Sequence, residues 1–225
     1  MMLIYRIICL FIGYAFGLIQ TSYLLGRKYH IDIRKVGSGN AGTTNTLRTL
    51  GLKAGLLVLV VDVLKAFAAV MIVKVIFRGS PAAHILPLLG VYAGTGCILG
   101  HNYPFYLGFK GGKGIAATLG MLLAIDTKAA LFAFGLFLVV FFTTHYVSLG
   151  SMVGYVTAYI LVVILGALGH YGMDFAATVE MDIILGFLTV QAIFRHRENI
   201  KRLINGNERK TYLKKKDHPT VERGE

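Results

Sequence analysis

The sequence predicts an all-α polytopic membrane protein with about seven transmembrane helices, some of them short. Two properties of the composition support this fold class: 56% of the 225 residues are hydrophobic, and the mean hydropathy is +0.66. A soluble domain of this size does not need so much apolar side chain. In addition, several apolar runs approach the length of about 20 residues with which a helix crosses a bilayer core of roughly 30 Å.

Seven apolar segments follow one another along the chain, at 3–25, 54–77, 85–100, 115–125, 129–144, 152–168 and 181–194. The first contains only one charge, Arg6, and we interpret it as a retained helix and not as a cleaved signal peptide. The short segments 115–125 and 129–144 flank Asp126-Thr127-Lys128. They indicate either two tilted helices joined by a tight hairpin or one broken helix. The segment 181–194 is also short, and we expect its helix to begin a few residues earlier.

The charge distribution predicts the orientation. With seven spans and the N-terminus outside, two basic loops and the tail after Arg195 lie in the cytoplasm, whereas Asp126, Asp174, Glu180 and Asp182 lie outside. This is the asymmetry of the positive-inside rule, with the C-terminus cytoplasmic. The net charge of +12 then reflects topology and anionic headgroups, so no nucleic-acid partner is expected. We expect residues 1–204 to form the membrane domain and residues 205–225 a basic, flexible cytoplasmic tail.

Two further features lie inside the apolar segments. Asp62 and Lys65 are three residues apart and therefore share one helical face. They form either a mutually neutralised pair facing the bundle or a wall of the functional site, since ionisable groups at membrane depth must face protein or water. Cys9 and Cys97 are interpreted as small core hydrophobes, and neither a disulfide nor a metal site is expected.

Four polar clusters interrupt the apolar pattern, all on the predicted cytoplasmic side. The first runs from Gly37 to Arg48 and is rich in small hydrogen-bonding residues. Its candidate ligand residues are Gly37, Ser38, Gly39, Asn40, Thr44, Asn45 and Arg48. The asparagines donate and accept hydrogen bonds, and the guanidinium of Arg48 offers a planar fork suited to phosphate. The alternative is a flexible linker.

The second cluster centres on a glycine loop, 108–114, that precedes an apolar helix. Glycine N–H groups, lysine charge and a helix N-terminus together favour the binding of an anion such as phosphate. The candidates are His101, Asn102, Lys110, Gly111, Gly112, Lys113 and Gly114. Lysines that merely snorkel to the interface are the alternative. His101 is either a general base or a residue that braces the loop.

The remaining two clusters are shorter. Ser148 and Ser151 lie in a loop without Lys or Arg, where they either donate to a ligand or only cap a helix. In the segment 196–208, His196 and Asn199 share a helical face. The alternative for this last segment is a basic juxtamembrane helix. There is no GxSxG elbow, no Walker A loop and no HExxH or paired CxxC motif, which argues against serine-hydrolase, nucleotide and zinc chemistry.

These clusters resemble, in content and order, the PlsY family of bacterial acyl-phosphate:glycerol-3-phosphate acyltransferases. The matching stretches are GSGNAGTTNTLR (37–48), GHNYPFYLGFKGGKGIAAT (100–118), VSLGS (147–151) and HRENIKRLINGNE (196–208). The length and hydropathy of the chain fit the remainder. The segment 169–182 and the tail beyond Glu208 look longer than in compact members of the family.

The resemblance implies an enzyme that transfers a fatty acyl group from acyl phosphate to the 1-hydroxyl of sn-glycerol 3-phosphate. The products are lysophosphatidic acid and phosphate, in the first step of bacterial phospholipid synthesis. By analogy, Ser38, Arg48 and Lys113 would hold the phosphates, while His196 and Asn199 would orient glycerol 3-phosphate. The proton acceptor is either substrate phosphate or a histidine, His196 or His101.

The expected partners are therefore acyl phosphate, glycerol 3-phosphate and membrane lipid, without a cofactor or a metal ion. The expected location is the cell membrane, spanned several times, with the active site facing the cytoplasm. The competing hypothesis is a membrane transporter of a phosphorylated or organic anion. It is disfavoured because the polar motifs gather on one side and no internal repeat pairs the two halves.

Overall fold

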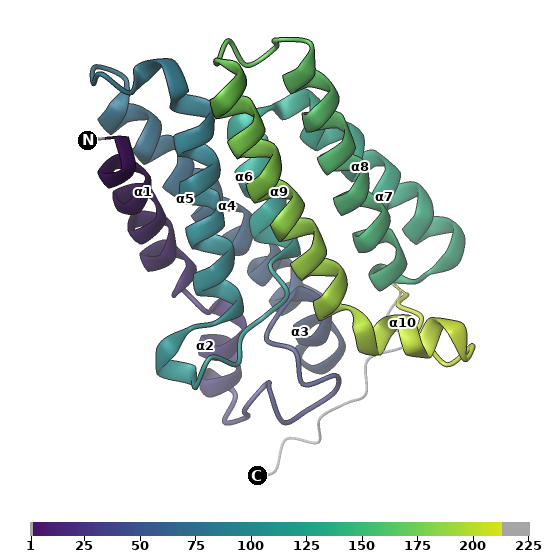
Figure 1. The fold of residues 1–225 in the computed structure, drawn as a ribbon. Helices are drawn as coiled ribbons and strands as arrows, with labels where there is room; N and C mark the ends of the chain where they lie inside the picture. The colour runs from purple at the N-terminus through teal and green to yellow at the C-terminus, as the bar shows by residue number, and fades with distance from the viewer. Residues whose placement is uncertain (1, 213–225) are drawn as a thin grey trace.

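The computed structural model describes residues 2–212, which form a bundle of helices (Figure 1). In chain order the elements are α1 (Met2–Gly17), α2 (Thr21–Lys28), α3 (Thr43–Leu50), α4 (Leu52–Phe77), the 3-10 turn η1 (Ala83–Ile85), α5 (Leu86–Asn102), the 3-10 turn η2 (Phe105–Leu107), α6 (Ile115–Ile125), α7 (Thr127–Thr144), α8 (Val147–Ala167), α9 (Phe175–Arg195) and α10 (Arg197–Ile204). The all-α fold class predicted from the sequence is confirmed.

Six helical stretches within the described residues are long and apolar enough to cross a membrane, and α6 is a shorter apolar helix. At Asp126 the chain turns between α6 and α7, and the two helices pack against each other. The Asp126 carboxylate accepts the N–H of Ala129 at 2.9 Å and so caps the start of α7. Of the two arrangements expected for this region, the structure has two helices joined by a tight hairpin.

The first apolar segment, 3–25, is not one continuous helix: it is interrupted between α1 and α2. Gln20 lies buried in the gap and donates through Nε2 to the carbonyl oxygen of His101 at 3.0 Å. The carbonyl oxygen of Ile19 accepts from Lys65 Nζ at 2.7 Å. The Lys65 side chain from α4 therefore satisfies a backbone carbonyl at the break, and backbone carbonyl oxygens at the end of α5 accept from the Gln20 side chain, as irregular backbone at membrane depth requires.

The helix α5 is the centre of the bundle. In the apolar stretch that contains α5, 67% of the residues are buried, whereas the share in the other five long stretches is 17–39%. Close packing on α1 depends on glycine: a Cβ added to Gly13 would lie 1.8 Å from the carbonyl oxygen of Ala93, and one added to Gly96 would lie 2.1 Å from that of Leu10. On its other faces α5 packs against α4, α6 and α9.

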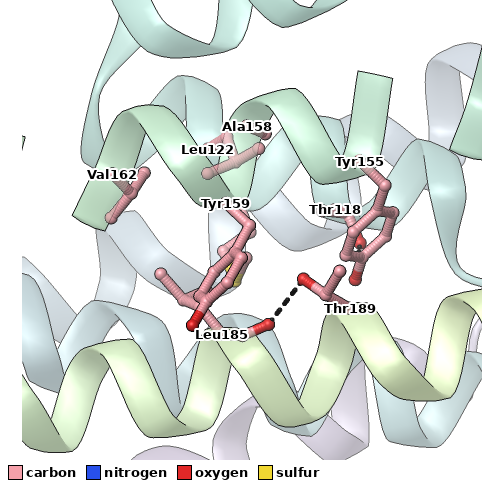
Figure 2. A pocket seen from close by; sticks show the side chains of 9 residues that line it. Thr118, Leu122, Tyr155, Ala158, Tyr159, Val162, Leu185 and Thr189 are labelled. Carbon is pink, nitrogen blue, oxygen red and sulfur yellow. Dashed lines mark hydrogen bonds between the residues drawn. The ribbon is translucent and has the colours of Figure 1, made fainter. Parts of the chain in front are cut away.

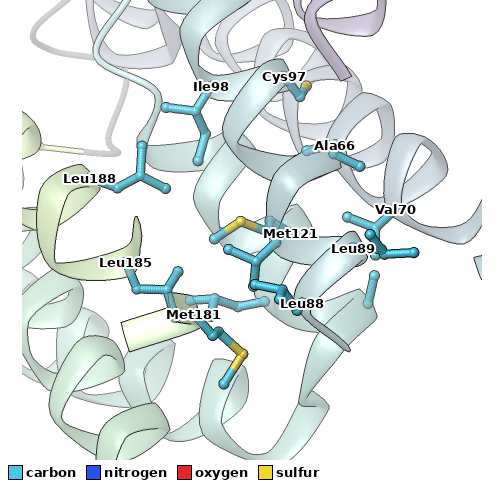
Figure 3. Close-up of a cluster of buried hydrophobic side chains, with 14 of the residues drawn as sticks. Ala66, Val70, Leu88, Leu89, Cys97, Ile98, Met121, Met181, Leu185 and Leu188 are labelled. Atoms are coloured by element: carbon cyan, nitrogen blue, oxygen red, sulfur yellow. The ribbon is translucent and has the colours of Figure 1, made fainter. Parts of the chain in front are cut away.

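The core lies mainly between α4, α5, α6 and α9. Leu88, Met121, Met181 and Leu185 from three of these helices gather there, in a cluster shown in Figure 3. The outward faces of α1, α4, α7 and α9 instead expose large apolar side chains such as Phe11 and Phe187. Exposed apolar faces around a packed interior are what a lipid-facing bundle requires.

The polar motifs meet at one end of the bundle. Figure 1 shows α2, α3, α10 and the loop after α5 at the same end, opposite the end at which α1 begins. This is the convergence that the alternating direction of the predicted spans requires.

Residues 205–212, which the sequence places in a flexible tail, pack back onto the bundle. Glu208 and Thr211 are buried, and the Thr211 N–H donates to the carbonyl oxygen of His145 at 2.9 Å. Tyr212 lies against the His145 ring, with 4.7 Å between the ring centroids. Within this stretch of the expected tail, Glu208 and Thr211 are therefore held by buried polar contacts, while the residues around them are exposed. The rest of it, residues 213–225, lies outside the described residues.

Candidate active site

Lys113 lies at the centre of the polar end, in the loop that enters α6. Its Nζ donates to Oδ1 of Asn199 on α10. Burial lowers the pKa of Lys113 to about 8, and three nearby arginines act in the same direction, while Glu208 opposes them. A partly desolvated ammonium of this kind gains much by meeting an anion.

His196 joins α9 to α10 and is buried. Its Nδ1 lies 2.8 Å from the carbonyl oxygen of Ala192, which only accepts, so Nδ1 carries the ring proton. Burial first, and then the charge of Lys113, lowers the pKa of His196 to about 4. The ring is therefore neutral near pH 7, and Nε2 is left as a hydrogen-bond acceptor.

Glu208 is the one carboxylate among these groups, and sequence reasoning did not select it. Its Oε1 accepts from Ser148 Oγ at 2.8 Å and from Asn199 Nδ2 at 2.7 Å, and its Oε2 accepts from Arg202 Nε at 2.8 Å. Burial by itself would raise the pKa of Glu208, but these hydrogen bonds outweigh it and the pKa is lowered. The signal in the sequence was its position at the end of the 196–208 motif.

Arg48 reaches the site from α3. Its Nη2 donates to Thr211 Oγ1 at 2.6 Å and to the carbonyl oxygen of Arg209 at 3.0 Å. Burial lowers its pKa, and Glu208 counteracts that effect. Arg48, which the sequence predicted to bind phosphate, is therefore held by residues of the C-terminal segment. It lies close enough to Lys113 for its charge to lower the pKa of that lysine.

Arg195, at the end of α9, is a second residue that sequence reasoning missed. Its guanidinium stacks over the Tyr103 ring at 4.9 Å, and its Nε is buried without a hydrogen-bond partner among the described residues. It looked like a topology-setting charge because it stands at the end of an apolar span. Arg195, Arg48, Lys113 and Arg202 thus place four positive charges near the single negative charge of Glu208. This excess of positive charge favours the binding of an anion.

The first motif divides into residues that brace and residues that remain available. The Asn45 side chain is fully used: Oδ1 accepts the N–H of Ser38 at 2.8 Å, and Nδ2 donates to the carbonyl oxygens of Ile33 and Val36 at 2.9 and 3.0 Å. Asn45 thus fixes the loop, whereas the hydroxyl-bearing Ser38 side chain is exposed.

Glycines give the Ser38 loop its shape. Gly37 and Gly39 flank Ser38 with φ of +61° and +71°, which suits residues without a Cβ. Asn40 and Thr44 are half-buried beside the same loop. These contacts present Ser38 at the surface of the polar end.

The glycine loop is built differently from the expected cradle. The N–H groups of Gly111 and Gly112 donate to the carbonyl oxygens of Asn102 and His101, both at 3.1 Å. They are therefore committed within the protein. The amides with which the loop can meet an anion are those of Lys113, Gly114 and the first turn of α6, where a helix N-terminus favours negative charge. Lys110 is exposed, away from the contacts of Lys113.

His101 and Asn102 both lie buried behind this loop. Nδ1 of His101 is 2.9 Å from Lys65 Nζ, and Asn102 Nδ2 donates to Gln191 Oε1 at 3.2 Å. Of the two roles considered for His101, the geometry favours bracing of the loop. The Asp62–Lys65 pair joins the same cluster, with 2.7 Å between Nζ and Oδ1.

The two serines of the third motif differ in their contacts. Ser148 reaches Glu208, as described, and so belongs to the site. Ser151 donates to the carbonyl oxygen of Val147, one turn earlier in α8, at 2.7 Å. Its hydroxyl is thus satisfied within its own helix.

A groove between α6, α8 and α9 begins beside the site. It is shallow in this structure and is lined by Thr118, Met121, Leu122, Tyr155, Ala158, Tyr159, Val162, Leu185 and Thr189. Figure 2 shows the hydroxyls of Tyr155 and Thr118 near one end, and the two bond at 2.9 Å. Thr118 lies one turn after Gly114, so the lining of the groove begins close to the glycine loop.

Known proteins are similar to this chain in sequence and in architecture. Residues 7–206 match the family model described as "Glycerol-3-phosphate acyltransferase". Curated proteins of that name from Thermosipho melanesiensis and Clostridioides difficile are 43% and 42% identical, over 90% and 93% of this chain and 90% and 97% of their own lengths.

The fold is also similar to solved structures. The crystal structure of PlsY, an integral membrane glycerol 3-phosphate acyltransferase, in its glycerol 3-phosphate form superposes with a TM-score of 0.79 at 34% identity, over 92% of this chain and 96% of that one. The lysophosphatidic acid form gives a TM-score of 0.76 at 33% identity, with the same coverage. The sequence match, the fold and the cationic site agree: the chain is an integral membrane protein of the glycerol-3-phosphate acyltransferase family.

Proposed function

We propose that this protein transfers a fatty acyl group from acyl phosphate to the 1-hydroxyl of sn-glycerol 3-phosphate, and releases lysophosphatidic acid and phosphate. The observation that carries the proposal is the cluster of Arg48, Lys113, Arg195 and Arg202 around the single carboxylate of Glu208. Both substrates bring phosphate groups, which repel each other unless cations screen them. A site for one small anion would not need four cations.

The chemistry requires positioning more than activation. Acyl phosphate is a mixed anhydride, so the glycerol hydroxyl attacks its carbonyl carbon directly, the new ester C–O bond forms, and the C–O bond to phosphate breaks. Lys113 and Arg48 hold the phosphate groups and stabilise the charge that develops on the leaving phosphate. The exposed Ser38 hydroxyl and the amides at the start of α6 supply additional hydrogen-bond donors.

The proton of the attacking hydroxyl passes to substrate phosphate. His196 is a weak base because its pKa is lowered to about 4, whereas the second pKa of a phosphate ester is about 6. The unprotonated Nε2 of His196 instead accepts a hydrogen bond from the glycerol part and orients it, next to Asn199. This assigns the two residues the roles expected from the family resemblance.

The acyl chain occupies the groove between α6, α8 and α9. Its lining includes Thr118, one turn after Gly114, and the apolar side chains of Leu122 and Val162. An apolar chain in contact with these side chains is removed from water without leaving the helix bundle.

The proposed membrane arrangement counts the short helix α6 as a seventh crossing, which puts the two ends of the bundle's chain on opposite sides of the membrane. The positive-inside rule then favours α1 beginning outside and α9 ending in the cytoplasm. The cationic end then faces the cytoplasm, on the inner side of the cell membrane, where glycerol 3-phosphate is available. Labelling of single cysteines placed at Gly79 and Gly206 by an impermeant reagent in intact cells would test this orientation, with reaction expected only at Gly79.

The activity is tested with protein purified in detergent and supplied with acyl phosphate and glycerol 3-phosphate. Equal amounts of lysophosphatidic acid and phosphate are expected. Phosphate release without lysophosphatidic acid would indicate hydrolysis only. Absence of both products, with uptake of a phosphorylated anion by reconstituted vesicles, would favour the transporter.

A further inference from the structure

Asp62, Lys65 and His101 form a polar cluster inside the bundle. Their exposed fractions are 2%, 4% and 4%, so all three are shielded from solvent. Lys65 Nζ lies 2.7 Å from Asp62 Oδ1 and 2.9 Å from His101 Nδ1. Charges in such a position are costly unless they are paired, and a neutral apolar packing would avoid that cost. The mechanism proposed above does not use any of the three directly.

The contacts of Lys65 determine the state of the His101 ring. The ammonium has three N–H donors, and its three neighbours are Asp62 Oδ1, the Ile19 carbonyl oxygen and His101 Nδ1. An ammonium does not accept hydrogen bonds, so Nδ1 accepts, and the proton of the neutral ring is on Nε2. Lys65 therefore fixes both the tautomer and the orientation of the ring.

The opposite edge of the His101 ring touches the glycine loop. A Cβ added to Gly112 would lie 2.0 Å from His101 Nε2 and 2.8 Å from the carbonyl oxygen of Ala41. In addition, the Gly112 N–H donates to the His101 carbonyl oxygen at 3.1 Å. Gly112 precedes Lys113, and Ala41 belongs to the loop that carries Ser38. The imidazole thus lies against Gly112, and Gly112 in turn lies beside the loop that carries Ser38.

We propose that Lys65, with Asp62 as its counter-ion, is a positioning residue of the acyltransfer reaction. Its ammonium holds the His101 ring, and the ring holds Gly112 at the height that places Lys113 beside Asn199. Through Ile19 the same ammonium fixes the break before α2, from which the Ser38 loop follows. Lys65 itself touches no substrate. This inference rests on the proposed phosphate site at Lys113.

The test compares two lysines of the same helix. Lys74, also on α4, is half-buried, and its one hydrogen bond within residues 2–212 goes to the carbonyl oxygen of Ala124, at the end of α6 remote from Gly114. Lys65→Met is expected to raise the KM for glycerol 3-phosphate and its Kd about 10-fold, equivalent to about 1.4 kcal/mol, with a smaller change in kcat. Lys74→Met is expected to lower the melting temperature but to leave both constants within about 2-fold.

Two results would overturn the inference. One is a folded Lys65→Met protein with the parent KM and Kd, and the other is an equal loss of affinity in Lys74→Met. If Lys65→Met does not fold, the double variant Asp62→Asn, Lys65→Met removes both charges and leaves none unpaired. It is expected to show the same rise in Kd, because His101 still loses its donor, and a parent-like Kd would equally contradict the inference.

The readouts separate this inference from the proposed function. Binding of glycerol 3-phosphate is measured by calorimetry and does not require turnover. A parent protein that binds glycerol 3-phosphate but makes no lysophosphatidic acid would count against the proposed reaction alone. Unchanged binding in the Lys65 variants would count against the positioning role alone.

Discussion

The two ends of the helix bundle use charge in different ways. At the end where α1 begins, Arg6 donates through Nε and Nη2 to the two carboxylate oxygens of Glu180, each at 2.6 Å, and Tyr92 donates to the same carboxylate at 2.6 Å. One cation meets one anion in a bidentate pair, the strongest common geometry for such a contact. The cluster joins α1, α5 and α9 and leaves no charge over.

At the other end, Arg48, Arg195 and Arg202 gather around Lys113, and the nearby carboxylate of Glu208 accepts a hydrogen bond from Arg202. Arg48 is held by a carbonyl and a hydroxyl, and Arg195 keeps a buried Nε without a partner among the described residues. Partly buried cations that are not neutralised cost free energy, which an anionic ligand returns when it binds. The comparison teaches that a balanced ion pair joins helices at one end, whereas the excess of positive charge at the other end is where we propose that the substrates bind.

The largest effect on activity is expected from Lys113→Met. This change removes the cation at the centre of the positively charged cluster. The value of kcat/KM for glycerol 3-phosphate should therefore fall about 100- to 1,000-fold, as when an enzyme loses one preorganised donor that stabilises the transition state. Lysophosphatidic acid formation measures it. Lys128→Met, an exposed lysine at the opposite end, is the matched control, and an equal loss there would show that the position of the charge is irrelevant.

The next largest effect is expected from Arg48. Arg48→Ala should lower kcat/KM about 10- to 100-fold, because a hydrogen bond to a charged group contributes about 1.5–3 kcal/mol. Arg48→Lys should recover only part of this, since an ammonium lacks the planar fork. Steady-state kinetics with both substrates measures the change. Full recovery by lysine would argue against bidentate phosphate contact.

The pH dependence sharpens the comparison further. Lys113 is protonated in the free enzyme below its pKa of about 8, so kcat/KM should fall about 10-fold for each pH unit above that value. Lys113→Arg should abolish this alkaline limb, because a guanidinium keeps its proton. The profile is measured from pH 6 to pH 10 in detergent. An alkaline limb that persists in Lys113→Arg would assign the titration to another group.

Ser148 and Ser151 provide a matched pair one turn apart. Ser148→Ala removes a donor to Glu208 and should reduce kcat/KM about 5-fold, equivalent to about 1 kcal/mol. Ser151→Ala removes only a bond within α8 and should leave kinetics unchanged. Equal losses in the two variants would show that the helix, and not the contact with Glu208, matters.

The smallest effect on activity is expected at the balanced end. Arg6→Met leaves the Glu180 carboxylate without its cation, and should lower the melting temperature by the equivalent of about 1–3 kcal/mol while kcat/KM stays within about 2-fold. Thermal unfolding and initial rates on the same preparation check both parts. A loss of activity comparable with that of Lys113→Met would remove the distinction between the two ends.

Much of the fold is readable from the sequence because hydropathy and charge act locally. The boundaries of α6 follow from the apolar run 115–125 and from Asp126, which caps the next helix. The break between α1 and α2 could not be predicted from the sequence, because its hydrogen-bond partners, the Lys65 side chain and backbone carbonyls of α5, are distant along the chain. Gln20 is a polar residue within the apolar run, but its role is explained only by its hydrogen bonds to the carbonyl oxygens of α5.

The candidate site shows the same division between local and tertiary causes. Arg48, Lys113, His196 and Asn199 were selected because their motifs are compact in sequence, and the structure brings them together. Glu208 contacts Ser148 across 60 positions of the chain, a proximity that no local pattern encodes. The amides of Gly111 and Gly112 are another such case, because their partners are carbonyl oxygens at the end of α5.

The central claim is that the cationic end holds two phosphate groups at once. The most direct measurement is equilibrium binding of radiolabelled glycerol 3-phosphate to the purified protein with and without a saturating acyl phosphonate, a non-reacting analogue of acyl phosphate. Binding of both ligands together, weakened strongly by Lys113→Met, is the predicted result. Complete displacement of glycerol 3-phosphate by the acyl phosphonate would mean one shared phosphate position and would contradict the account.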